Sequence, residues 1–98
     1  MNKTIIIPTT ETIGLDLKGQ IFKRNSMYFD FAEFPKGTEY PIVYNIDKKS
    51  LAYEKGLRIG DKIIKLNGFS LYCKDISTVI CDFEYEKKNS KYLTIVYI

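Results

Sequence analysis

Alternating apolar and polar residues predict short β-strands over most of the chain. Residues 3–7, with three consecutive Ile, are predicted to form a first strand that ends at Pro8, and 13–17 alternates apolar and polar residues as a half-buried strand does. The same signals predict further strands at 42–46, 62–67, 69–72 and 92–98. Eight Tyr and six Phe residues, with many Ile and Val, favour strands over helices. The chain is therefore predicted to be mainly β.

A short helix is predicted at 50–55. Ser50 is its N-cap, because a serine hydroxyl accepts a hydrogen bond from the first free backbone N–H groups of a helix. Gly56 ends it, because many helices need a left-handed residue at this point. The residues Gly60-Asp61 and Asn67-Gly68 are turn dipeptides that enclose the next strand.

One longer helix is predicted after Asp75, which serves as its N-cap. Its apolar residues fall at i, i+3, i+4 and i+7 and therefore share one face: Ile76, Val79, Ile80 and Phe83. Lys87 and Lys88 suit the negative end of the helix dipole, and Asn89 is expected to cap the helix.

Composition places the chain among ordinary globular domains. Its 98 residues suit one domain with one core, and 45% hydrophobic with 28% charged residues is typical of a folded protein. A net charge of +3, with both signs interspersed, does not indicate a nucleic-acid partner. No apolar stretch approaches the about 20 residues of a membrane span, and 4–8 is too short for a signal peptide. The sequence is compatible with a cytosolic protein and with a module excised from a longer protein, so the localisation is not predicted. The oligomeric state is not predicted either.

The residue types argue against an enzyme. The chain has no His, which removes His-based triads, most acid–base schemes near neutral pH and most transition-metal sites. Cys73 and Cys81 are expected to be free thiols, because about 12 Å would separate them along a helix and two Cys without His make no common zinc site. Asp61 is expected to serve a turn, and Glu84 and Glu86 to be solvated. No catalytic residue, metal or cofactor is therefore expected.

The clearest motif spans the short helix, a turn and the next strand. It consists of Ala52 and then Gly56-Leu57-Arg58-Ile59-Gly60-Asp61-Lys62-Ile63-Ile64-Lys65-Leu66-Asn67-Gly68. This stretch closely resembles the central signature of PDZ domains, which is an Ala in a short helix followed by Gly-Leu-Arg-x-Gly-Asp-x-Ile-x-x-(Val/Ile/Leu)-Asn-Gly. The order of the predicted elements extends the resemblance to most of the chain.

The resemblance implies both a fold and a function. The fold is mainly β with two helices, a PDZ-like partly open antiparallel β-barrel or sandwich capped by one short and one long helix. Residues 1–98 are expected to form a single PDZ-like domain. PDZ domains bind an extended peptide as an added strand, in the groove between their second strand and long helix.

The place of this groove depends on which of two registers the chain adopts. In the first, 13–17 is the strand beside the long helix and 19–40 is an insertion. In the second, 28–34 is that strand, paired with 42–46, and 25–28 is the loop that binds the carboxylate. The second gives shorter connections. We favour the first, because it supplies a Gly and a preceding strand at the spacing usual in the family.

In the first register, Thr12-Ile13-Gly14-Leu15 resembles the family's Gly-Leu-Gly-Phe loop, with Thr in place of the first Gly. The backbone N–H groups of such a loop bind the terminal carboxylate of a peptide. Many family members carry Lys or Arg before this loop, whereas 8–11 has neither. The resemblance assigns peptide binding to Thr12, Ile13, Gly14, Leu15, Asp16, Leu17, Ile76, Ile80 and Phe83.

The implied ligand is a peptide or protein C-terminus that ends in apolar–x–apolar. Its last side chain is expected among Ile13, Leu15, Leu17 and Phe83. Ile76 is expected to face the side chain two positions upstream, where it offers no hydrogen bond to Ser or Thr, and Ile80 lies further along. The helical stripe has a second interpretation as core, which is expected for Val79 and Phe83 in any case and stays open for Ile76 and Ile80.

Two further functions stay open. The chain could be the regulatory or substrate-recruiting module of a larger protease, which the length of the full reading frame would test. It could also be a structural or oligomerising domain whose groove is covered by its own 19–40 segment. That segment has more apolar side chains than a surface loop needs, namely Phe22, Met27, Tyr28, Phe29, Phe31 and Phe34.

Overall fold

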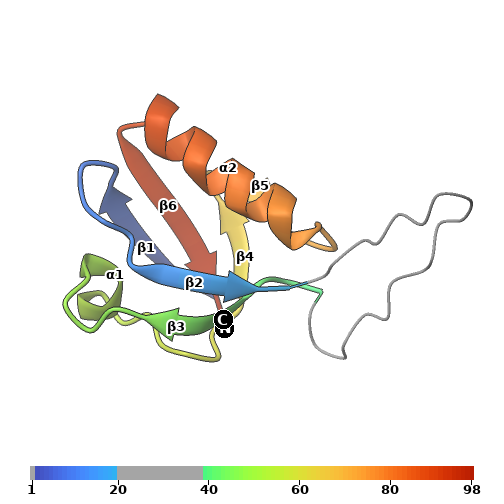
Figure 1. Ribbon diagram of the computed structural model, residues 1–98, viewed down its shortest axis with the longest axis horizontal. Helices are drawn as coiled ribbons and strands as arrows, with labels where there is room; N and C mark the ends of the chain where they lie inside the picture. Colours follow the sequence, from blue (N-terminus) through green and yellow to red (C-terminus); the bar gives the residue numbers. More distant parts are fainter. Residues whose placement is uncertain (1, 20–38) are drawn as a thin grey trace, which may run out of the picture.

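The computed structural model describes residues 2–19 and 39–98, and these residues form six strands and two helices (Figure 1). In chain order the elements are β1 (Lys3–Pro8), β2 (Leu15–Lys18), β3 (Ile42–Ile46), α1 (Leu51–Glu54), β4 (Ile63–Leu66), β5 (Phe69–Ser70), α2 (Ile76–Asn89) and β6 (Tyr92–Tyr97). This is the predicted order. The second register's strand at 28–34 and its loop at 25–28 lie outside the described residues.

The strands form two antiparallel sheets that do not close into a barrel. One has four strands in the order β1-β6-β4-β5, and the other consists of β2 and β3 (Figure 1). Backbone bonds join them where β3 meets the turn before β4: the Val43 N–H donates to the Asp61 carbonyl at 2.9 Å, and the Gly60 N–H donates to the Val43 carbonyl at 2.8 Å. The structure confirms the mainly β fold with one short and one long helix, in an open form.

The core follows from the alternation in the strands. Ile5 and Ile7 of β1 are buried, whereas Ile6 between them is 49% exposed, because successive side chains of a strand point to opposite faces. In β6 the buried set is Leu93, Ile95 and Tyr97. Val79 and Phe83 of α2 cover this layer, as the helical stripe predicted. Each fully buried side chain of this kind contributes about 1.5–3 kcal/mol.

The signature motif has a local structural role at the end of α1. The Gly56 N–H donates to the Tyr53 carbonyl and the Leu57 N–H donates to the Ala52 carbonyl, both at 3.0 Å. This pair of bonds is a Schellman motif, and it requires the positive φ of 113° that Gly56 adopts. The Arg58 N–H then donates to the Asp61 carboxylate at 2.8 Å, so Asp61 serves the turn as expected.

Three local predictions differ from the structure. β2 begins at Leu15, so Ile13 and Gly14 belong to the loop before it. Asn89 is the last residue of α2 rather than its cap, because its side-chain amide donates back to the Tyr85 carbonyl and Ser90 occupies the C-cap. Glu86 was predicted to be solvated, but its carboxylate accepts hydrogen bonds from the side chains of Asn67 and Ser90.

Asn67 joins the β4–β5 turn to β6 and α2. It has a positive φ of 48°, its N–H donates to the Thr94 carbonyl at 2.8 Å, and its Oδ1 accepts from the Thr94 N–H at 2.7 Å. Its Nδ2 donates to Glu86 Oε2 at 3.1 Å, and the Ser90 hydroxyl donates to the same oxygen at 2.5 Å. The signature Asn therefore fixes the C-terminal half of α2 on the sheet.

We expect Asn67→Gly to lower the free energy of unfolding by about 2 kcal/mol, because Gly keeps the backbone conformation and loses the side-chain bonds to Thr94 and Glu86. Asn67→Ala should cost about 1 kcal/mol more, since Ala is strained at positive φ. Urea unfolding measures both. Equal stability of Asn67→Gly and the wild type would show that the side-chain bonds contribute nothing.

Candidate functional site

One edge of β2 has no strand partner among the described residues. β2 pairs antiparallel with β3, from Leu15 opposite Ile46 to Lys18 opposite Ile42. This is the pairing that the first register predicts. α2 packs along the other side of β2 (Figure 1). An unpaired strand edge presents free N–H and C=O groups, so the space between β2 and α2 is suited to an added strand.

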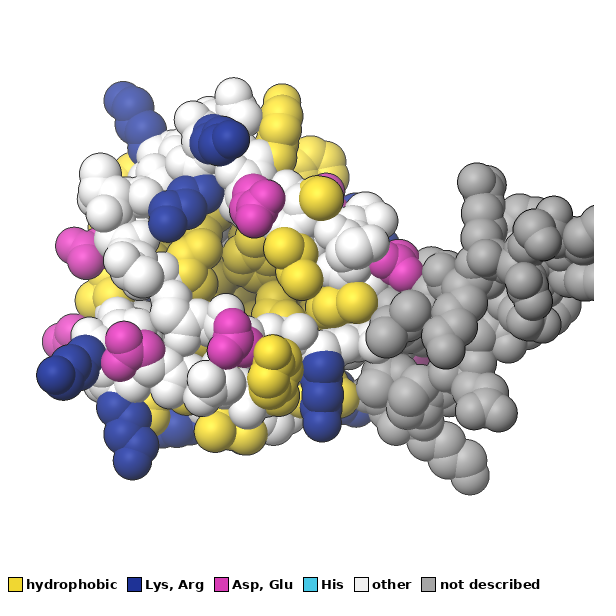
Figure 2. Space-filling model, viewed as in Figure 1, with side chains coloured by type: hydrophobic (Ala, Val, Ile, Leu, Met, Phe, Trp, Pro, Cys, Tyr) yellow, Lys and Arg dark blue, Asp and Glu magenta, His cyan; other side chains and the backbone are white. Residues whose placement is uncertain are grey.

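A cavity of about 220 Å³ lies in this groove. Its apolar lining comes from the loop before β2, from β2 itself and from α2: Ile13, Leu15, Leu17, Ile80 and Phe83. Two carboxylates and an aromatic ring complete it: Asp16, Glu84 and Tyr44. Figure 2 shows hydrophobic side chains in a hollow between α2 and β2, with acidic side chains on both margins. The site is apolar at its floor and negatively charged at its rim.

The structure brings together most of the residues that the sequence assigned to the site. Ile80 is 44% exposed into the groove, and Phe83 belongs to both the groove and the core. Ile76 is half-buried, packs on the core cluster and lies beside Gly19, and it is not part of the cavity lining. Thr12 is exposed in the loop before β2 and does not line the cavity either.

Sequence reasoning missed Tyr44 and Glu84. The pairing of β2 with β3 shifts after Asp16, whose partner is Asn45, to Leu17, whose partner is Val43. Tyr44 is therefore the extra residue of a β-bulge, which turns its side chain toward the groove. No pattern in the sequence marks this bulge. Glu84 follows Phe83 in α2, so the helical period alone could have placed it at the groove margin.

The loop before β2 is held in place through Gly14. Gly14 has a φ of +68°, and its carbonyl accepts a hydrogen bond from the Asp47 N–H at 2.8 Å. A Cβ atom here would lie 2.9 Å from the Ser50 Cβ and 3.0 Å from the Asp47 Cβ. Ser50 is itself buried and is the N-cap of α1. The conformation of the loop thus depends on a residue without a side chain.

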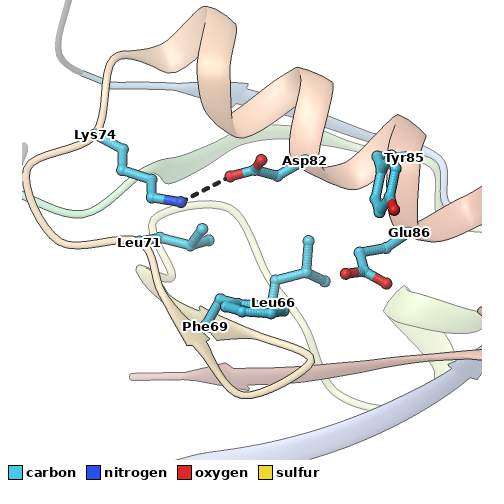
Figure 3. A pocket seen from close by; sticks show the side chains of 7 residues that line it. All are labelled: Leu66, Phe69, Leu71, Lys74, Asp82, Tyr85 and Glu86. Carbon is cyan, nitrogen blue, oxygen red and sulfur yellow. Dashed lines mark hydrogen bonds and ion pairs between the residues drawn. The ribbon is translucent and has the colours of Figure 1, made fainter.

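A second pocket, of about 280 Å³, lies on the other side of α2 (Figure 3). Leu66, Phe69 and Leu71 form its apolar part beneath the helix. Its charged groups have partners within the protein: Lys74 pairs with Asp82 at 2.9 Å, and Glu86 accepts from Asn67 and Ser90. These polar groups attach α2 to the sheet, whereas at the groove no described strand pairs with the edge of β2.

The other candidate groups lie outside the groove lining. Cys73 and Cys81 are free and exposed, and no group of His, Cys, Asp and Glu in the described ranges could hold a metal ion. The pKa of the Tyr72 phenol is raised, first by its hydrogen bond with the Cys73 side chain, and then by its electrostatic interaction with Cys73, by desolvation and by the nearby Glu39. Neither helix of the described chain is long and apolar enough to cross a membrane.

Comparison with known proteins identifies the fold. No protein-family model matches the chain, and no curated protein matches it in sequence. Among solved structures, the second PDZ domain of Dlg1 from the choanoflagellate Monosiga brevicollis is similar, with a TM-score of 0.72 and 17% identity over 100% of this chain and 92% of that one. The first PDZ domain of dmPar3, solved in complex with the dmPar6 PBM, gives a TM-score of 0.70 and 17% identity over 98% and 92%. These similarities confirm the PDZ fold that the sequence signature implied.

We expect Gly14→Ala to lower the free energy of unfolding by about 3 kcal/mol, because Ala adds strain at positive φ and its methyl group collides with Ser50 and Asp47. Gly68→Ala is the matched control. Gly68 also has a positive φ, of 84°, but a Cβ there meets nothing within 4 Å, so only the strain of about 1–2 kcal/mol should remain. Chemical denaturation compares the two, and equal losses would contradict the packing role of Gly14.

Proposed function

We propose that this chain, which has the PDZ fold, is a peptide-binding module. The ligand is an extended segment of another protein, and it adds as a strand to the open edge of β2, beneath α2. One observation carries this proposal: an edge of β2 that has no strand partner among residues 2–19 and 39–98 borders a cavity lined by Leu15, Leu17 and Phe83. Main-chain hydrogen bonds would supply affinity without regard to sequence, and the cavity would select a side chain. No residue of the chain is assigned a catalytic role.

The ligand that fits this site is a C-terminus of the form apolar–x–apolar. The cavity of about 220 Å³ has an apolar floor and suits the last side chain. Ile80 offers only apolar surface to the side chain two positions upstream, and Ile76, which packs on the core cluster, offers no hydrogen bond either. A Ser or Thr there would lose its hydrogen bonds to water without gaining a partner, so an apolar residue should be preferred.

The terminal carboxylate would meet the loop from Thr12 to Leu15. Within the described part of the chain, no hydrogen bond has the Ile13 or Gly14 N–H as its donor. Donors of this kind at the end of an apolar cavity are suited to a carboxylate. One of the two similar structures is the PDZ1 domain of dmPar3 in complex with the dmPar6 PBM. This complex supports the proposed class of function.

A two-dimensional NMR titration tests the proposal. Peptides that end in apolar–x–apolar would be added to the labelled domain, each with a free carboxylate and as the C-terminal amide. We expect shifts concentrated at 13–17 and 76–83, and much weaker binding of the amide. Shifts at 25–31 instead would keep peptide binding but place the site in the other register. If no peptide binds at millimolar concentration, the proposal is wrong, and a groove that the protein itself covers is favoured.

We expect Ile80→Glu to weaken peptide binding at least tenfold, because it removes apolar contact and adds charge to the groove. Stability should change by less than about 0.5 kcal/mol, since Ile80 is 44% exposed on the surface of a helix. Ile59→Glu is the matched control, because Ile59 is 64% exposed and is not part of the groove lining. Isothermal titration calorimetry measures both, and equal affinities would place the ligand elsewhere.

A further inference from the structure

The outer face of β2 carries two opposite charges in a fixed order. Leu15 and Leu17 turn toward the core and form part of the groove floor, while Asp16 and Lys18 are exposed on the solvent face of the strand, where Asp16 reaches the rim of the groove. The Asp16 carboxylate accepts one hydrogen bond, from the Asn45 side chain at 3.1 Å. The one ion pair between described residues joins Lys74 and Asp82, so neither charge of β2 is paired within that part of the chain.

An added strand would bring its own side chains next to these charges. The argument rests on the proposed function, in which the ligand runs antiparallel to β2 with its C-terminus at the Ile13–Gly14 loop. If the last residue lies opposite Leu15, the penultimate residue lies opposite Asp16, the third from the end opposite Leu17 and the fourth opposite Lys18. Directly opposite residues project from the same face, with Cβ atoms about 4.5–5.5 Å apart. The x position of apolar–x–apolar is therefore the neighbour of Asp16.

Charged side chains at the rim of the groove add to the negative electrostatic potential at the x position. The lining residues include two carboxylates, Asp16 and Glu84, and no cation. Tyr44 is 50% exposed beside Asp16, where its ring can contact the aliphatic stem of a Lys or Arg or bind its charge. A basic residue at x gains from all three groups. An acidic residue at x faces two like charges.

We propose that this groove selects its ligand by the order of charges along the peptide. The preferred C-terminus has an acidic residue at the fourth position from the end, opposite Lys18, and a basic residue at the penultimate position, opposite Asp16. The pattern is acidic–apolar–basic–apolar with a free carboxylate. Cross-strand pairs of opposite charge each change an equilibrium constant by about 1.4- to 5-fold. Reversing both pairs at once should therefore change affinity by about tenfold.

Three peptides of equal length test the charge order. They share the same upstream residues and end in Glu-Val-Lys-Ile, Lys-Val-Glu-Ile and Gln-Val-Gln-Ile, so the first two have identical composition and net charge. With the wild-type domain we expect the first to bind about tenfold more tightly than the second, with the neutral peptide between them. The difference should shrink in 0.5 M salt, because these charges are exposed and are screened over about 4–5 Å.

Two double variants complete the experiment. Asp16→Lys with Lys18→Asp exchanges the charges on β2 and should reverse the order of the two charged peptides. Lys74→Asp with Asp82→Lys exchanges a partly buried pair on the other side of α2, away from the groove, so it should leave the order unchanged. Both domains keep their composition and net charge. Circular dichroism and thermal unfolding confirm that each has folded before titration.

The outcomes separate this inference from the proposed function. If the neutral peptide binds and the two charged peptides bind equally, the function stands and the charge-order inference is wrong. The inference is also wrong if the β2 exchange leaves the preference as it was. If none of the three peptides binds, the proposed function fails and the charge order fails with it.

Discussion

The fold and the groove both depend on how α2 packs against the sheet. Val79 and Phe83 are buried, and they hold the helix on the core. Phe83 also lines the groove, so one aromatic side chain belongs to the core and to the groove at once. A change in this contact would alter stability and the width of the groove together.

Polar contacts fix α2 at a distance that leaves room beside β2. Asn67 bonds Glu86 near the C-terminal end of the helix, and Lys74 pairs with Asp82 in its middle. The Thr9 hydroxyl donates to the Ser90 carbonyl at 2.8 Å, which ties the end of β1 to the end of the helix. All these contacts involve the helix end or the side of α2 away from the groove. The apolar floor of the groove is therefore left uncovered by the protein's own described residues.

The surface of the site divides into parts with different physical roles. The inner face of β2 and the helical stripe offer apolar surface, which favours burial of any side chain of suitable size. The outer face of β2 carries the charges of Asp16 and Lys18, whose effect on affinity would be smaller and, under the proposed charge selection, would depend on their order. Affinity and specificity would then come from opposite faces of the same four-residue strand.

The fold could be predicted from the sequence because its signals are local and agree with one another. A run of Ile that ends at Pro8 marked β1, the 3.6-residue stripe marked α2, and Gly56 and Asn67 marked positions where only a few residues tolerate a positive φ. The apolar wall of the groove followed from the same stripe and from 13–17. Two registers remained open, because local patterns do not say which strand pairs with Ile42–Ile46.

The tertiary structure decided what depends on contacts between distant residues. It paired Leu15–Lys18 with Ile42–Ile46, and it introduced the bulge that brings Tyr44 to the groove. It also brought Asn67 within hydrogen-bond distance of Glu86, a residue that the helix pattern alone predicted to be solvated. Ile76 packs against the core and does not line the cavity. The sequence by itself determined the strands, the helices, the turns and the PDZ fold. Which side chains meet in the groove was decided by strand pairing and helix packing, because these bring together residues far apart in the chain.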